Sequence, residues 1–174
     1  MRTRTTAALA TAAAIAITGC GGGGKQEAGG GGAQPVQGLT LPPESSDINV
    51  KPVIPKPSGA PPTALQSRDV VSGNGKTAEA GDELSVQYVG VSWSTGQEFD
   101  SSWSRNKEAF KFPLAQGMVI PGWDQGLVGM QVGGRRQLVI PPDQAYGPQG
   151  QPPAIGPNET LVFVIDLEKV KKAK

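Results

Sequence analysis

The sequence predicts an α+β fold, in which one short helix lies across a curved antiparallel β-sheet. Three observations support this prediction. All nine aromatic residues of the 174-residue chain (three Trp, two Tyr, four Phe) fall in its second half, so the main core lies there. Short apolar–polar alternations separated by Gly and Pro turns recur between residues 63 and 172, as in antiparallel sheets. Only the stretch around Trp123 has helical spacing.

Three segments are expected to be strands. Residues 84–88 alternate apolar and polar side chains, and residues 161–167 do the same before a basic tail. A further strand is expected at residues 137–140, after the Gly133-Gly134 turn. A period of two indicates a strand with one buried face, so we expect the polar members of each alternation to face solvent.

The expected helix begins at Pro121, because proline is favoured at the first helical position. Trp123, Leu127 and Met130 follow at spacings of four and three, which places them on one face. Such a short helix needs a sheet to pack on. A helix that closes one end of a curved sheet would leave room for an apolar pocket between the two.

Residues 1–19 are typical of a secretory signal, with a basic start, a mostly alanine apolar run and small residues before Cys20. The run has about 12 residues, fewer than the roughly 20 that a membrane-spanning helix needs. A buried alanine-rich helix is the alternative, but no cap or amphipathic pattern accompanies it. Ile17-Thr18-Gly19-Cys20 resembles the bacterial lipoprotein box, which implies that Cys20 carries a fatty acyl chain such as palmitate. A free thiol or an intermolecular disulfide is the other interpretation of Cys20.

The chain after Cys20 is expected to be a tether. Residues 20–47 contain two runs of four glycines and cannot bury much apolar surface, so they are predicted to be flexible. Residues 48–62 are rich in proline, which predicts an extended or polyproline-like segment on the outside of the domain. The predicted domain therefore comprises residues 48–174, with its core at 63–172.

The composition excludes several kinds of chemistry. The chain has no histidine and one cysteine, which excludes a Ser-His or Cys-His nucleophile pair, a His-ligated zinc ion, an internal disulfide and a thiolate metal cluster. Its formal net charge of +1 argues against a nucleic-acid partner, which requires clustered positive charge. We therefore expect no metal, no cofactor and a function that depends on shape and apolar surface.

Ten short motifs follow one another in register through the second half of the chain. They are Val86-Gln87-Tyr88-Val89-Gly90, Phe99-Asp100-Ser101-Ser102, Arg105-Asn106-Lys107, Phe110-Lys111-Phe112, Val119-Ile120-Pro121-Gly122-Trp123, Leu127-Val128-Gly129-Met130, Val132-Gly133, Ile140-Pro141-Pro142, Ala145-Tyr146-Gly147 and Thr160-Leu161-Val162-Phe163. Together they resemble the FK506-binding-protein family of peptidyl-prolyl cis-trans isomerases. The resemblance implies a half-barrel of antiparallel strands wrapped around one short helix, and rotamase activity on proline-containing polypeptides.

The resemblance also implies which residues line the substrate pocket. Trp123 would form the floor under the proline ring, although a tryptophan at this place without the motif would be read as plain core. The walls would come from Tyr88, Phe110, Val119, Ile120 and Phe163.

Polar groups would then act on the twisting amide. By the resemblance, Phe99 completes the wall nearest to that amide, and Asp100 lies beside its carbonyl carbon, oriented by Tyr88 and Arg105. In the alternative interpretation, Asp100 only caps a loop and Arg105 is a solvated charge.

Two hydrogen-bond donors are also implied, the backbone N–H of Ile120 near the helix start and the phenol of Tyr146. The loop of residues 146–157 would form the rim. It carries Gln151 and Ala154 where relatives often have a histidine and a larger aliphatic residue, while Ile155 keeps its apolar character and is expected to bind substrate. These departures bear on the affinity for FK506-like macrolides.

The sequence therefore predicts a monomeric isomerase that assists the folding of exported proteins and is held at the outer side of the cell membrane through Cys20. A binding module or holdase that uses the same groove without rotation is the alternative, and a structural spacer is a third. Trp93 and Trp103 match no pocket position and are expected at the surface or rim. Arg135-Arg136 is expected to be a charged pair at a strand start.

Overall fold

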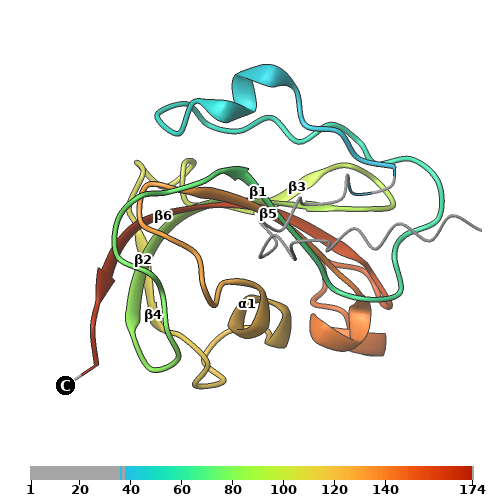
Figure 1. Cartoon of the computed structure of the whole chain (residues 1–174). Helices are drawn as coiled ribbons and strands as arrows, with labels where there is room; N and C mark the ends of the chain where they lie inside the picture. The colour runs from blue at the N-terminus through green and yellow to red at the C-terminus, as the bar shows by residue number, and fades with distance from the viewer. Residues whose placement is uncertain (1–35, 37, 174) are drawn as a thin grey trace, which may run out of the picture. The chain divides into compact units, whose positions relative to one another are not determined.

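Six antiparallel strands form one curved sheet in a computed structural model that describes Val36 and residues 38–173 (Figure 1). The strand order is β1-β5-β6-β2-β3, and β4 pairs with β2 beside β3. The strands are β1 (Gln66–Val71), β2 (Glu83–Ser92), β3 (Glu98–Ser101), β4 (Phe110–Pro113), β5 (Arg135–Ile140) and β6 (Leu161–Lys171). The long central pair, β2 and β6, stays in contact from Glu83 opposite Lys171 to Ser92 opposite Leu161.

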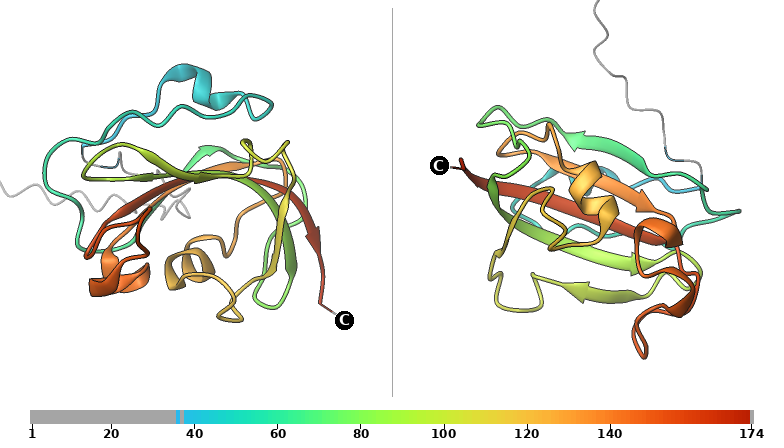
Figure 2. Two further views of the ribbon diagram at one scale, coloured as in Figure 1. Left: turned by 180° about the vertical axis from the view of Figure 1, so that it is seen from behind. Right: turned by 90° about the horizontal axis from the view of Figure 1, so that it is seen from below.

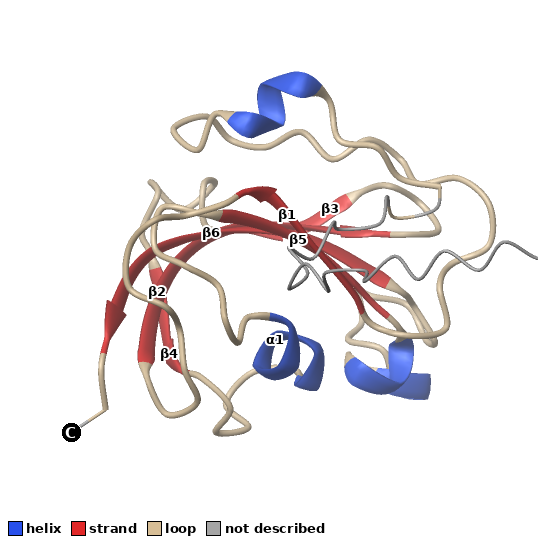
Figure 3. Ribbon diagram, in the orientation of Figure 1, coloured by secondary structure: helices blue, strands red, loops and turns tan. Residues whose placement is uncertain are grey.

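The helix α1 (Pro121–Gly126) lies in the hollow of this sheet, as Figures 1 and 2 show. The predicted α+β fold, a curved antiparallel sheet with one short helix, is thereby confirmed. The helix is shorter than its apolar spacing suggested, because it ends at Gly126. Leu127 and Met130 follow it in a turn, yet both are buried in the core. Figure 3 shows three short 3-10 segments outside the sheet: η1 (Pro43–Ser46), η2 (Pro142–Gln144) and η3 (Gly147–Gln149).

The main core fills the space between α1 and the inner face of the sheet. It contains the apolar members of the predicted alternations together with the residues at and after the helix. Its buried members are Ala78, Leu84, Val86, Tyr88, Phe112, Leu114, Trp123, Leu127, Met130, Leu138, Ile140, Ile155, Leu161, Phe163, Ile165, Leu167 and Val170.

Part of the outer face of the sheet is also covered, which corrects the expectation of one solvated face. Every residue of β2 after Glu83 is buried. At Val89 and Val91 this burial comes from a second cluster, in which Val36, Leu39 and Ile54 pack on outward-facing residues of the sheet. The sheet members of this cluster are Val89, Val91, Val139, Val162 and Val164.

The covering segment consists of Val36 and residues 38–62, which we call the N-terminal arm. It crosses the outer side of the sheet in Figure 1. The arm includes residues up to 47 that the sequence assigned to a flexible tether. Leu39, one of them, is only 3% exposed, so this part of the chain is packed on the domain. The arm also buries Trp93, whose indole donates to the Gly59 carbonyl at 3.3 Å, so Trp93 is not the surface residue that was expected. The packed chain thus begins before residue 48.

A buried arginine that is paired within the sheet also joins the arm to the sheet. The Arg135 side chain is fully buried and binds Asp166 on β6, with Nη2 and Oδ2 2.7 Å apart. Its remaining N–H groups donate to the arm carbonyls of Ser45, Asp47 and Val50 at 2.8 to 3.0 Å. A buried charge that loses its partner typically costs 3–5 kcal/mol, about the same as a large core truncation. Arg135 and Arg136 begin β5, as expected, and the buried Arg135 also anchors the arm.

Several predictions concern residues outside the described part of the chain. They are the signal at residues 1–19, the acylation of Cys20 and the flexibility of the tether up to residue 35. Within the described residues, no helix is long and apolar enough to cross a membrane.

Candidate active site

A cavity of about 250 Å³ opens between α1, the inner face of the sheet and the loops at its rim. Most of its lining is aromatic or aliphatic, and one carboxylate stands at its edge. The lining residues are Tyr88, Phe99, Asp100, Phe110, Met118, Val119, Ile120, Trp123, Tyr146 and Phe163.

Trp123 is the centre of the aromatic lining. Its ring meets Tyr88 and Phe163 edge-on, with ring centroids 5.2 Å away in each case. Phe99 meets Phe163 in the same edge-to-face manner at 5.5 Å, and Phe110 lies 6.1 Å from Trp123. Edge-to-face pairs at such distances are favourable beyond the burial that they provide. The rings therefore hold one another in a fixed lining.

Gly90 on β2 makes room for two of these rings. A Cβ atom at this position would lie 2.7 Å from both the Phe163 ring and the Phe99 ring, which is closer than real Cβ contacts. Any side chain here would displace Phe99 or Phe163. The glycine in the Val86–Gly90 motif is thus needed for the shape of the cavity.

Tyr88, Asp100 and Arg105 form a connected polar group at the cavity edge. The Tyr88 hydroxyl donates to Oδ2 of Asp100, and Nη1 of Arg105 donates to Oδ1. Nη2 of Arg105 donates to the Tyr88 oxygen at 2.7 Å, and its guanidinium lies 5.6 Å from the centre of the Tyr88 ring. The amide of Ser101 also donates to Oδ1 of Asp100, at 2.8 Å. These contacts fix the carboxylate orientation.

The two phenols of the site keep their protons at neutral pH. Burial, and then the hydrogen bond to Asp100, raise the pKa of Tyr88 to about 12. Burial, and then the Asp100 charge, also raise the pKa of Tyr146. The hydrogen bonds to Tyr88 and then to Asp100 raise the pKa of Arg105, so it stays charged. The site can donate hydrogen bonds over a wide pH range.

Ile120 stands at the start of α1, where its carbonyl accepts the Trp123 amide at 2.9 Å. Within the described chain, the Ile120 N–H itself has no acceptor, as is usual before the first turn of a helix. This N–H and the Tyr146 phenol are the two donors that the sequence motifs imply. Both residues line the cavity.

The structure brings most of the selected residues together. Nine of the eleven line the cavity; the other two are Arg105, which contacts Asp100 and Tyr88 from outside, and Ile155. Ile155 is buried in the core, and its backbone pairs with Gln151, so it supports the rim loop from within. Met118 was missed. It is 70% exposed at the cavity edge, and no sequence pattern singled it out.

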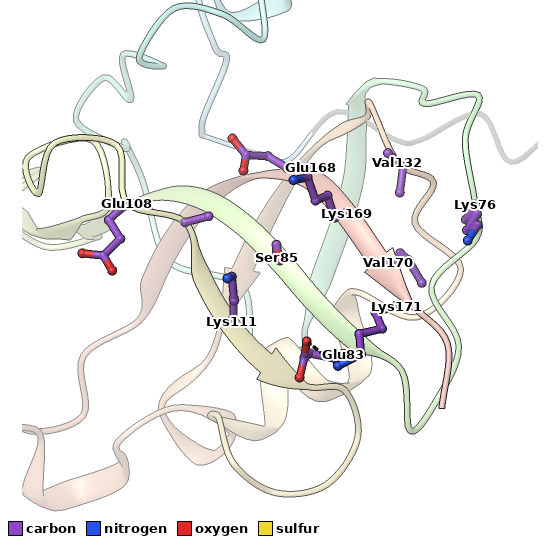
Figure 4. A pocket seen from close by; sticks show the side chains of 11 residues that line it. Lys76, Glu83, Ser85, Glu108, Lys111, Val132, Glu168, Lys169, Val170 and Lys171 are labelled. Atoms are coloured by element: carbon purple, nitrogen blue, oxygen red, sulfur yellow. Dashed lines mark hydrogen bonds and ion pairs between the residues drawn. The ribbon is translucent and has the colours of Figure 1, made fainter. Parts of the chain in front are cut away.

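A second, larger hollow lies on the outer side of the sheet and is drawn in Figure 4. It has a volume of about 880 Å³ and lacks aromatic residues. Four lysines and three glutamates line it, and Lys171 pairs with Glu83 at 3.4 Å. Within the described residues, no group of three or more potential ligands could hold a metal ion. The aromatic cavity is therefore the better candidate for an active site.

Comparisons with known proteins agree with this choice. Residues 74–168 match the family model of FKBP-type peptidyl-prolyl cis-trans isomerases. An FK506-binding protein of Streptomyces anulatus is 51% identical over 121 residues, which cover 69% of this chain and 97% of that protein. The peptidyl-prolyl cis-trans isomerase Fkbp12 of Drosophila melanogaster is 44% identical over 108 residues, which cover 62% of this chain and 98% of that protein.

Solved structures show the same likeness. The crystal structure of AtFKBP13 superposes with a TM-score of 0.58 at 36% identity, covering 64% of this chain and 96% of the other. The crystal structure of FkpA from Escherichia coli gives 0.57 at 42% identity, covering 64% of this chain and 50% of the other.

The raised pKa of Tyr88 predicts a loss of stability in alkali. An unfolded chain releases a tyrosine proton near pH 10, whereas folded Tyr88 holds it to about 12. The unfolded state binds fewer protons than the folded state between these pH values. The contribution of Tyr88 to the free energy of unfolding is therefore constant below about pH 10 and falls above it. Urea unfolding at pH 9 and pH 11 should show a smaller fall for Tyr88→Phe than for the parent. Equal falls would contradict the assignment.

Proposed function

The chain belongs to the FKBP-type peptidyl-prolyl cis-trans isomerase family and catalyses rotation about Xaa-Pro bonds; from this premise we propose how its cavity acts and where it works. The observation that supports this proposal most strongly is an aromatic cavity with one fixed carboxylate and two hydrogen-bond donors at its edge.

Prolyl rotation suits such a cavity. Turning the bond breaks amide resonance, with a barrier of about 18–20 kcal/mol, and takes tens to hundreds of seconds unassisted. No proton moves and no covalent bond forms. A catalyst need only bind the twisted amide better than the planar one. The twisted amide has a less polar carbonyl, so a lining of Trp123, Phe99 and Phe163 that excludes water penalises it less than the planar form.

The edge groups orient and stabilise the substrate. The proline ring rests on Trp123, and the Ile120 N–H and the Tyr146 phenol donate to substrate carbonyls. Asp100 faces the carbonyl carbon as an electrostatic partner, and Tyr88 and Arg105 hold its carboxylate in place. The hydrogen bonds among these three residues support this arrangement.

The isomerase works at the outer side of the cell membrane, attached through an acylated Cys20. The signal-like start and the lipoprotein-like box at residues 17–20 support this location. Val36 is the first described residue that packs on the sheet, so the proposed linking segment comprises residues 21–35, and a glycine-rich coil of that size would span roughly 20 Å. Exported polypeptides with Xaa-Pro bonds are then the clients, and the domain acts as a monomer.

FK506-like macrolides are the proposed inhibitors. The Streptomyces relative is an FK506-binding protein, and a macrolide would occupy the same cavity as the proline. The rim residues Gln151 and Ala154 would then set its affinity.

The proposed role of Phe99 predicts a selective loss of activity. In Phe99→Ala, kcat/KM on a Leu-Pro peptide should fall about tenfold, equal to about 1.4 kcal/mol of transition-state stabilisation. The ring is only partly buried, so the urea midpoint should change little. A protease-coupled isomerisation assay on the full chain measures the rate.

Trp103→Ala provides the matched control, because Trp103 packs on the outer cluster, away from the cavity. It should keep the parent rate. A Phe99→Ala variant that isomerises as fast as the parent would refute the role of Phe99. If the parent protein isomerises the peptide no faster than the uncatalysed rate but still suppresses aggregation, the result would favour a holdase.

The proposed anchor predicts a membrane-bound protein with a modified N-terminus. Expressed in a bacterium that processes lipoproteins, the chain should fractionate with membranes, and the extracted protein should begin at Cys20 with the added mass of acyl chains. Cys20→Ser should appear in the soluble exported fraction with its isomerase activity intact. An unmodified Cys20 in the membrane extract would rule the anchor out.

A further inference from the structure

One wall of the cavity is a turn that links β4 to α1. Residues 114–120 make this turn, and three of them, Met118, Val119 and Ile120, line the cavity. The Ile120 N–H is a proposed hydrogen-bond donor to the substrate. The backbone path of the turn therefore determines the positions of this N–H and of the Met118 and Val119 side chains.

The ends of the turn are held by the backbone. At one end, buried Leu114 donates to the Asp82 carbonyl and accepts from the Gly81 amide, both at 2.8 Å. At the other end, the Ile120 carbonyl accepts the amides of Trp123 and Asp124, at 2.9 and 3.3 Å. These bonds are part of the fold and do not depend on the shape of the turn between them.

The middle of the turn lacks such support. Residues 115–118 are exposed, and Ala115 and Gly117 have positive φ values of 58° and 68°. Ala115 thus adopts a backbone conformation that residues with a Cβ rarely adopt. A conformation of this kind persists only where surrounding contacts impose it.

The imposing contact is the Asp124 side chain, which reaches back from α1. Its Oδ1 accepts the Ala115 N–H and its Oδ2 accepts the Gly117 N–H, each at 2.8 Å. In the part of the chain that the structure describes, no other hydrogen bond reaches residues 115–119. Both carboxylate oxygens are therefore used on the two residues with positive φ, directly before Met118.

We propose that Asp124 is a positioning residue for the isomerase reaction, which holds the turn so that Met118, Val119 and the Ile120 N–H meet the substrate. The proposal rests on the isomerase activity and adds a residue that touches no substrate. It predicts an effect on binding more than on the rotation step, because Trp123 and Asp100 are held by other contacts.

The test compares Asp124→Ala and Asp124→Asn with Gln125→Ala in the full chain. Gln125 is the exposed neighbour of Asp124 on the same helix, so its variant controls for a change in α1 itself. Each protein is assayed for kcat and KM on a Leu-Pro peptide, and hydrogen exchange is followed at the Ala115 and Gly117 amides. Asp124→Asn keeps the size of the side chain and one acceptor oxygen, so it serves even where the alanine variant folds poorly.

Suppose that in the Asp124→Ala variant the turn has the substrate-binding conformation in only about a tenth to a third of the molecules. KM then rises about three- to tenfold while kcat changes little. The Ala115 and Gly117 amides then exchange faster, Asp124→Asn is intermediate and Gln125→Ala matches the parent. Faster exchange with an unchanged KM would overturn the proposal, as would unchanged exchange at both amides. The isomerase activity of the parent protein is measured first. Either of these results would therefore overturn the role of Asp124 without contradicting the isomerase function.

Discussion

The cavity depends on how closely α1 approaches the sheet. A Cβ atom at Gly122 would lie 2.4 Å from the Ile140 side chain, and one at Gly126 would lie 2.8 Å from Leu138. With no side chain at either position, the helix rests directly on β5, and Trp123 between them packs against the inner face of the sheet. A six-residue helix covers only part of that face, and the uncovered part is the aromatic cavity.

The same constraint explains why little polar chemistry is needed. In the proposed mechanism, a dry cavity lowers the barrier by favouring the less polar twisted amide, so the polar groups only have to orient the substrate. The chain has no histidine, and both of its tyrosines have pKa values raised by burial in the site. The groups that donate hydrogen bonds are thus phenols, a guanidinium and a backbone amide, none of which changes charge near neutral pH.

Much of the fold could be predicted from local patterns. The alternation along residues 84–88 and 161–167 identified the two central strands and the residues of each that face the core. Alternation could not show that part of the outer face is buried as well, because that burial comes from a distant segment. Val36 and Leu39 lie in a stretch whose glycines and polar residues suggest free chain, and only the packed sheet shows what they cover. The burial of Trp93 was not predicted for the same reason, and neither was the contact of Arg135 with the arm.

The site was predicted largely through its motifs, since aromatic residues at these spacings meet only after the sheet curves. Met118 and Asp124 could not be found in this way. An exposed methionine in a turn has no pattern, and the carboxylate of Asp124 reads as an ordinary helix residue until its two backbone partners are known. Contacts of this kind depend on the left-handed backbone of the turn, which the sequence indicates only at Gly117.

The central claim is that the cavity with Trp123 as its floor is where the prolyl bond turns. NMR exchange spectroscopy on a Leu-Pro peptide with the labelled protein tests it most directly, because it detects catalysed cis–trans exchange and the protein groups that the peptide perturbs in one sample. We expect exchange to accelerate and the shift changes to centre on the Trp123 indole, the Ile120 amide and the rings of Phe99 and Phe163. Accelerated exchange with shift changes confined to the outer hollow at Lys111 and Lys169 would contradict the account.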